Sequence, residues 1–103
     1  MGKLIVMEGI DGSGKTTVWR NARKHLGEQR RVWLHDPGDT RLGNRLRNIL
    51  LDPDIDKPFP MAQEAVLLLY LASRAQLVSE RILPALTEGF TVILDRYWPS
   101  TLS

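Results

Sequence analysis

Three glycines, a lysine and two threonines separate an apolar run from an amphipathic one, in the stretch EGIDGSGKTT (8–17). Within it, GIDGSGKT (9–16) matches the phosphate-binding pattern GxxxxGK[ST] in full. Glycines let the backbone curl so that successive N–H groups point inward, and a following helix adds the positive end of its dipole. Lys15 brings a compact charge to the outer phosphates, and Thr16 offers a hydroxyl to Mg²⁺. The pattern therefore predicts binding of a nucleoside triphosphate with Mg²⁺.

The alternative for this stretch is a glycine-rich turn that only joins a strand to a helix. The predicted strand before it and the predicted helix after it favour the phosphate site. The motif alone does not separate kinases from GTPases or ATPases. The residues expected to hold the ATP phosphates are Gly9, Gly12, Ser13, Gly14, Lys15, Thr16 and Thr17.

The elements that position this loop alternate between strand and helix. Strands are expected at 3–8, 30–35 and 90–94, and helices at 15–28, 41–51 and 61–88. The strand at 3–8 should be buried, and the segment 65–72 is apolar all round, so it should be buried on most sides. The long helix should bend ahead of Pro84, because proline cannot donate to the preceding turn. The alternation predicts an α/β fold with a mostly parallel sheet.

The residues suited to chemistry gather where the predicted strands end. They fall in the segments 8–17, 35–40 and 95–103. In sheets of this kind, ligands bind beyond the carboxyl ends of the strands. Agreement among the three segments supports a single site more strongly than any one motif does.

Composition narrows the class of protein. The chain of 103 residues has no cysteine and a net charge of +2. Residues 1–50 hold ten Lys/Arg against five Asp/Glu, and residues 51–103 hold four against seven, so the first half could attract phosphates. No basic run with interleaved aromatics indicates nucleic-acid binding, and the apolar segment 65–72 is too short to span a bilayer. We expect a cytoplasmic protein without nucleic-acid or membrane partners.

Four segments together carry a family resemblance: EGIDGSGKTT, DPGDTRLGNRLRNILLD, EAVLLLYLASRAQ…ILPAL and VILDRYWPSTLS. The series resembles the thymidylate kinase (dTMP kinase) family, which moves the γ-phosphoryl group of ATP to dTMP. The resemblance covers residues 1–103 but only the N-terminal half of the family's usual length. It implies a P-loop NTPase-type three-layer fold with a parallel sheet, like that of nucleoside monophosphate kinases, with this chain as the N-terminal part of one domain.

The resemblance implies roles for the residues nearest the reaction. Asp11 matches a carboxylate near the sugar 3′-hydroxyl and the reacting phosphates, and Lys15 is the phosphate-loop lysine. Arg96 matches an arginine on the monophosphate, and Asp95 a carboxylate near the metal, so Thr16 and Asp95 are the expected Mg²⁺ ligands. Phosphoryl transfer depends mainly on positioning and charge neutralisation, which these residue types can supply.

Further matches concern the monophosphate side. Asp36 and Pro37 match the Glu-Pro of the family's REPGG loop, and Arg47 matches an arginine that reaches the monophosphate. Arg47 could also be a solvated arginine on a helix face, because Arg41 and Arg45 are near it.

The base pocket is expected on the long helix and in the segment after the third strand. Tyr70 matches the aromatic that stacks on thymine, Arg74 the arginine that binds the base, and Ser100 lies in the base-side loop. Tyr70 and Arg74 are four residues apart, so they share a helix face. A tyrosine on an apolar helix could instead belong to the core, and Arg74 calls for either a structural carboxylate or a substrate as partner. The two histidines are not spaced as metal ligands, and the tryptophans are expected to pack.

The chain departs from the family pattern in its second loop. HDPGD replaces REPGG, with His35 for Arg, Asp36 for Glu and Asp39 for the second Gly. This keeps open a broader deoxynucleoside monophosphate kinase. Ser13 stands where some members carry a catalytic arginine, so the chain resembles the type that supplies arginine from a mobile lid.

The family's lid and C-terminal strands lie beyond Ser103. We therefore expect a fragment, or the ordered part of a longer protein, whose strand at 3–8 becomes an open sheet edge. A non-catalytic nucleotide-binding module also stays open. A homodimer through the long apolar helix is a further possibility.

Overall fold

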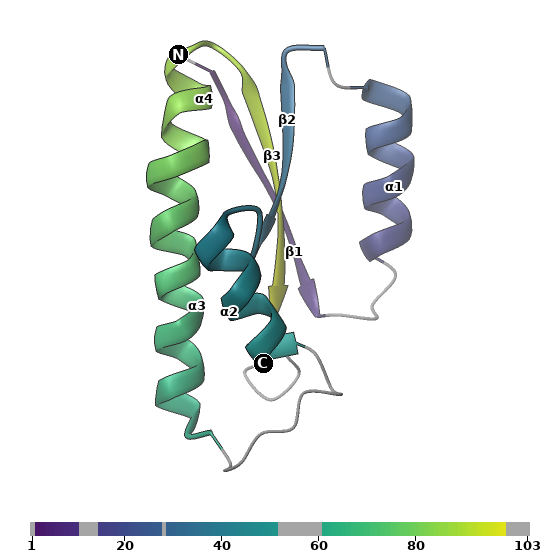
Figure 1. Ribbon diagram of the computed structural model, residues 1–103. Helices are drawn as coiled ribbons and strands as arrows, with labels where there is room; N and C mark the ends of the chain where they lie inside the picture. The colour runs from purple at the N-terminus through teal and green to yellow at the C-terminus, as the bar shows by residue number, and fades with distance from the viewer. Residues whose placement is uncertain (1, 11–14, 28, 52–60, 99–103) are drawn as a thin grey trace.

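The computed structural model describes residues 2–10, 15–27, 29–51 and 61–98. Strands and helices alternate along the chain, as the sequence predicts (Figure 1). The elements in chain order are β1 (Leu4–Ile10), α1 (Lys15–Leu26), β2 (Arg31–Asp36), α2 (Arg41–Leu51), α3 (Gln63–Leu77), the π-helical turn η1 (Val78–Ile82), α4 (Leu83–Thr87) and β3 (Thr91–Trp98). Helix α1 ends at Leu26 and is followed by Gly27, whose φ is 73° and whose N–H donates to the Arg23 carbonyl at 2.9 Å.

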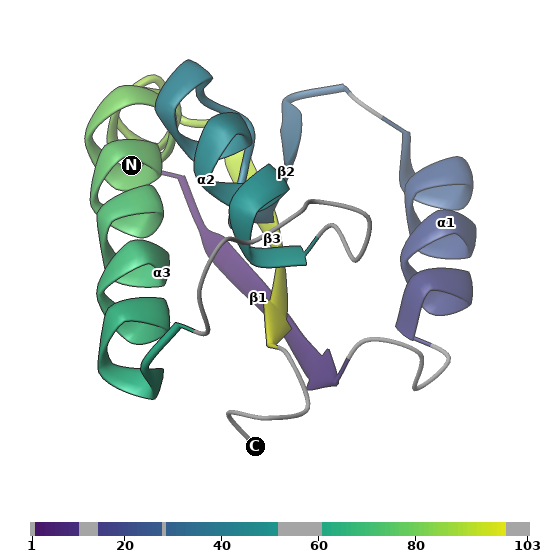
Figure 2. The same cartoon turned by 60° about the horizontal axis from the view of Figure 1, so that its bottom comes forward.

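The three strands form one parallel sheet in the order β1-β3-β2. Each connection between strands passes through helix, because parallel strands need a crossover. Helix α1 covers one face of the sheet, and α3 with α4 covers the other, where α2 packs beside α3 (Figures 1 and 2). The predicted three-layer α/β fold is therefore confirmed.

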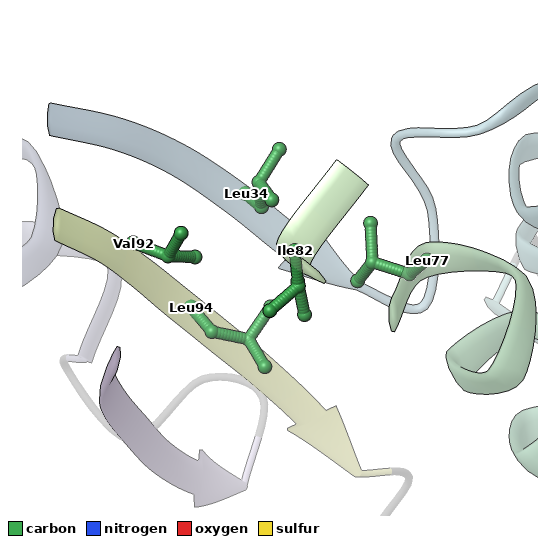
Figure 3. Packing of buried hydrophobic residues seen from close by; sticks show 5 residues of the cluster. All are labelled: Leu34, Leu77, Ile82, Val92 and Leu94. Atoms are coloured by element: carbon green, nitrogen blue, oxygen red, sulfur yellow. The ribbon is translucent and has the colours of Figure 1, made fainter. Parts of the chain in front are cut away.

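The core consists of two apolar clusters, one on each face of the sheet. The cluster between the sheet and the long helix contains Leu34, Leu77, Ile82, Val92 and Leu94 (Figure 3). The cluster on the α1 face contains Trp19, Trp33 and Ile93, with the two indole rings 5.1 Å apart in an edge-to-face arrangement. Neighbours along a strand, such as Trp33 and Leu34, face opposite layers because side chains alternate across a sheet.

The long helix differs from its predicted form in two ways. Ahead of Pro84, where a bend is predicted, it contains the π-helical turn η1, in which the Leu83 N–H donates to the Val78 carbonyl. Pro84 lacks an N–H, so widening the preceding turn keeps neighbouring groups bonded. The expected burial of 65–72 is wrong, because α2 and the sheet contact only one side of α3. Leu67, Leu68 and Leu71 are 43%, 65% and 44% exposed.

Strand β1 also differs from its predicted form. The sequence predicts a buried strand, but Leu4, Ile5 and Val6 are 46%, 50% and 37% exposed. Within the described residues β1 pairs only with β3, so it is an edge strand. This agrees with the expectation of an open edge there. Among the residues that the structure describes, no helix is both long enough and apolar enough to cross a membrane.

Candidate nucleotide site at the carboxyl edge of the sheet

Charged side chains form a row across the carboxyl end of the sheet. The register places Glu8 of β1 and Asp36 of β2 on either side of Arg96 in β3. Arg96 Nη1 lies 2.6 Å from Glu8 Oε1, and Arg96 Nε lies 3.7 Å from Asp36 Oδ2. The sequence predicts that Asp95 and Arg96 follow the third strand. Because β3 continues to Trp98, they lie within it instead. The backbone ladder itself therefore sets the position of this arginine.

Asp36 is the most buried member of this row. Its side chain is 0% exposed, and Arg74 Nε donates to its Oδ2 at 2.7 Å. A buried carboxylate is stable only when paired, and two guanidinium groups approach this one. The partner of Arg74 in this structure is therefore a carboxylate of the chain. Asp36 Oδ1 is buried and has no hydrogen-bond partner within the described part of the chain.

Asp95 occupies the neighbouring position on the central strand. It is paired in register with Met7 on one side and His35 on the other, and it is 0% exposed. Carboxylate oxygen is a ligand that Mg²⁺ prefers. Within the described residues, no group of three or more histidine, cysteine or acidic side chains could hold a metal ion. Mg²⁺ in phosphoryl-transfer sites needs only one or two protein ligands, so a single carboxylate here is compatible with that use.

The loop 36–40 joins β2 to α2 and is bonded to both helices beside it. The Asp36–Pro37 peptide bond is cis. Arg47 Nη1 of α2 donates to the Pro37 carbonyl at 2.7 Å, and the Gly38 N–H donates to Ser73 Oγ of α3 at 3.2 Å. The predicted substrate-side residues Asp36, Pro37, Arg47 and Arg74 are thus brought together around one loop.

The residue before α2 caps that helix. Thr40 Oγ1 accepts from the Gly43 N–H at 2.8 Å, which satisfies one of the donors at the start of α2. Thr40 is only 4% exposed. The cap fixes where α2 begins and therefore where Arg47 lies on it.

His35 and Asp39 form a pair that connects β2 to the end of the loop 36–40. Asp39 Oδ2 lies 3.0 Å from His35 Nδ1 and accepts from the His35 N–H at 2.5 Å. Burial raises the pKa of Asp39, but the hydrogen bonds and charge of His35 and the charge of Arg81 lower it by more. Its pKa therefore lies below the usual 3.8. An open pocket of about 240 Å³ is lined by His35, Gly38, Asp39, Asn44 and Arg47.

Tyr70 lies on α3, three residues before Ser73. It is 1% exposed, so its ring is enclosed within the chain in this structure. Its neighbour on the same helix, Ser73, is 0% exposed and bonds the loop. Stacking of thymine on Tyr70 requires the covering side chains to move, and it stays a prediction.

Much of the predicted phosphate loop lies outside the described residues. Asp11, Gly12, Ser13, Gly14 and Ser100 lie outside the described residues, as do the side chains of Lys15 and Thr16. The backbone of Gly9 lies in β1, and Thr17 is exposed on α1. The phosphate and Mg²⁺ contacts of this loop stay predictions, although a strand precedes it and a helix follows it, as the motif requires.

The structure gives a role at the site to three residues for which the sequence analysis predicts no role. Glu8 contacts Arg96, Ser73 holds the loop, and Asp39 pairs with His35. A signal existed for Glu8, because Glu8 and Arg96 both stand at the end of an apolar strand. No local pattern marks Ser73, because its partner is 35 residues away.

A parallel three-layer α/β fold with a strand–GxxxxGKT–helix segment and charged residues at the carboxyl edge defines a P-loop nucleotide-binding protein. The family model for thymidylate kinase matches residues 7–103. The chain therefore belongs to the thymidylate kinase family.

Individual relatives agree with this assignment. The chain is 45% identical to a thymidylate kinase of Carboxydothermus hydrogenoformans, over 99% of this chain and 49% of that protein. It is 47% identical to one of Caldanaerobacter subterraneus, over 97% and 47%. The chain thus spans about half the length of the curated relatives it matches.

Solved structures give the same picture. A thymidylate kinase of Ehrlichia chaffeensis superposes with a TM-score of 0.73 at 31% identity, covering 92% of this chain and 53% of that one. A thymidylate kinase of Candida albicans, described as having broad substrate specificity, gives 0.69 at 33% identity, covering 93% and 40%.

Proposed function

We propose that this chain is the N-terminal half of a dTMP kinase that transfers the γ-phosphoryl group of ATP to dTMP, giving dTDP and ADP. The observation that carries the proposal is the family match over residues 7–103. Residues 1–103 then form the N-terminal part of one kinase domain, and the protein acts in the cytoplasm in nucleotide biosynthesis. The absence of cysteine is compatible with that location.

The arginines of the site suit the monophosphate side of this reaction. Arg96 and Arg74 both approach Asp36, and Arg47 is bonded to the next residue of the same loop. Guanidinium groups bind phosphate oxygens through paired N–H donors, and holding them on carboxylates fixes their direction before substrate arrives. Glu8 and Asp36 would orient Arg96, and Asp36 would orient Arg74.

The donor side depends on the predicted phosphate loop. Lys15 would contact the outer phosphates, and Asp11 would lie near the reacting groups. Thr16 and Asp95 supply hydroxyl and carboxylate oxygens, which are the ligand types that Mg²⁺ accepts. When bound, Mg²⁺ would neutralise charge on the ATP phosphates. Tyr70 and Ser100 would contribute to the base pocket, and the exposed leucines of α3 suit a homodimer.

A second candidate is a broader deoxynucleoside monophosphate kinase. Its support is the His35–Asp39 pair in a loop where the family pattern has arginine and glycine. The broad substrate specificity described for the Candida albicans thymidylate kinase supports this alternative. A third candidate, a module that binds nucleotide without turnover, is distinguished by the same assay.

The test is ADP release from ATP and Mg²⁺ with dTMP, dUMP, dCMP, dGMP or AMP offered in turn. The assay compares the 103-residue chain, the full-length protein and a Lys15→Ala variant of the latter. We expect the full-length protein to prefer dTMP, the variant to lose at least about 100-fold in rate, and the short chain to be inactive. Equal turnover of several deoxynucleotides would favour the broader kinase. ATP binding without turnover by the full-length protein would favour the module.

A further inference from the structure

Asp39 connects three elements of the fold through its own polar groups. Its carboxylate accepts from His35 of β2, and its N–H donates to Asn44 Oδ1 of α2 at 2.8 Å. Its carbonyl accepts from Arg81 Nη1 of η1 at 2.9 Å. The end of the loop is thereby tied to the strand, to the following helix and to the long helix.

The backbone at Asp39 shows why the side chain matters. Its φ is 59°, in the left-handed region that non-glycine residues occupy rarely. A glycine would adopt this conformation more easily, so the cost of aspartate here must be offset by its contacts. Because a carboxylate can only accept, the Nδ1 of His35 that faces it carries the proton. The imidazole therefore acts as a donor toward the loop.

The same loop holds the cations of the monophosphate side. Asp36 at its start binds Arg74, and Pro37 binds Arg47. Moving the end of the loop would shift both contacts, because only Gly38 separates Pro37 from Asp39. Arg47 also lines the pocket that His35 and Asp39 line. A change at the pair should therefore alter the site where the monophosphate is expected to bind.

We propose that His35 and Asp39 form a positioning pair that locks the loop 36–40 and sets the affinity for the nucleoside monophosphate. The proposal rests on the proposed kinase function. The hydrogen bonds of Asp39 go to β2, α2 and η1, and the His35 ring lies 5.3 Å from that of Trp19 in α1. The effect of the pair should accordingly fall on the monophosphate and spare ATP.

The test uses steady-state kinetics of the full-length protein with each substrate varied separately. Asp39→Gly keeps the backbone conformation accessible but removes the anchor. His35→Phe keeps a ring beside Trp19 but removes the donor. Each should raise KM for dTMP by about fivefold and leave KM for ATP within about twofold. The double variant should be no worse than the single ones, because the two residues act as one unit.

Two further variants sharpen the result. Asp39→Asn keeps an acceptor and tolerates the left-handed backbone, so its KM for dTMP should stay within about twofold of the wild-type value. His25→Phe makes the matched change at an exposed histidine of α1 and should alter neither KM.

The outcomes distinguish failure of the positioning role from failure of the proposed kinase function. If the wild type phosphorylates dTMP but the variants lose only thermal stability, the pair is structural and the positioning role is wrong. An equal rise in both KM values would also overturn it, because the loss would be general. If the wild type phosphorylates no nucleotide, the proposed function fails and the inference fails with it.

Discussion

Single contacts at the carboxyl edge depend on the length and charge of individual side chains. Asp36 is one methylene shorter than the glutamate of the family pattern, yet its Oδ2 lies 2.7 Å from Arg74 Nε and 3.7 Å from Arg96 Nε. It does so because it is the last residue of β2, directly opposite Arg96 in the ladder. At this scale the backbone register compensates for the shorter side chain.

The His35–Asp39 contact predicts a dependence of stability on pH. The pKa of Asp39 is lower in the folded chain than the ordinary 3.8, so its contribution is fully present above pH 3.8. It is lost as pH falls through the lowered folded value. The difference in unfolding free energy between wild type and Asp39→Asn should therefore shrink as the pH falls below 3.8. Urea unfolding at each pH measures it, and a difference that grows toward acid would contradict the assignment.

At the scale of elements, the packing of α2 against α3 depends on a glycine. A Cβ added at Gly43 would lie 2.8 Å from Thr40 Oγ1, 2.9 Å from the Gly38 carbonyl oxygen and 2.9 Å from Ser73 Oγ. These atoms belong to the helix cap, the loop and the facing helix. The close approach of all three elements is possible because Gly43 has no side chain.

Gly43→Ala should therefore destabilise the chain, although alanine normally favours a helix. We expect a loss of about 1–3 kcal/mol in unfolding free energy, because one of the three neighbours is backbone and cannot rotate away. Asn48→Ala on the exposed side of α2 is the control and should change stability by less than about 0.5 kcal/mol. Thermal or urea unfolding gives both values. A Gly43→Ala protein as stable as the control would show that the helices can separate at no cost.

For the molecule as a whole, the apolar surface that the described chain leaves exposed includes strand β1 and one side of helix α3. Strand β1 presents Leu4, Ile5 and Val6, and α3 presents Leu67, Leu68 and Leu71. An apolar edge strand favours pairing with another chain, and an apolar helix face favours association. Both features belong to these 103 residues taken by themselves.

We accordingly expect the 103-residue chain to self-associate at about 100 µM, as measured by sedimentation equilibrium. Ile5→Lys should weaken association through the strand, and Leu68→Glu through the helix, each without loss of helical circular dichroism. Ser79→Glu adds the same negative charge as Leu68→Glu, at an exposed polar position of η1, and is the control. A monomeric wild-type chain at that concentration would contradict the expectation.

Local patterns in the sequence were sufficient for the element order, the parallel α/β class and the phosphate motif. The periodicity of strands and helices and the glycine pattern at 9–14 involve residues that are close together in the chain, so they can be recognised from the sequence alone. The bounds of α2 are those predicted, because Thr40 caps it and its leucines repeat at helical spacing.

The burial of those elements and the contacts of the site were decided only by the tertiary structure. Leu68 and Ile5 look like core residues in sequence, but burial depends on whether another layer covers them, and within the described residues none does. The pairs Glu8–Arg96 and Asp36–Arg74 join residues 88 and 38 positions apart. The crossovers of a parallel sheet bring such residues together, and no local spacing records which of them will meet.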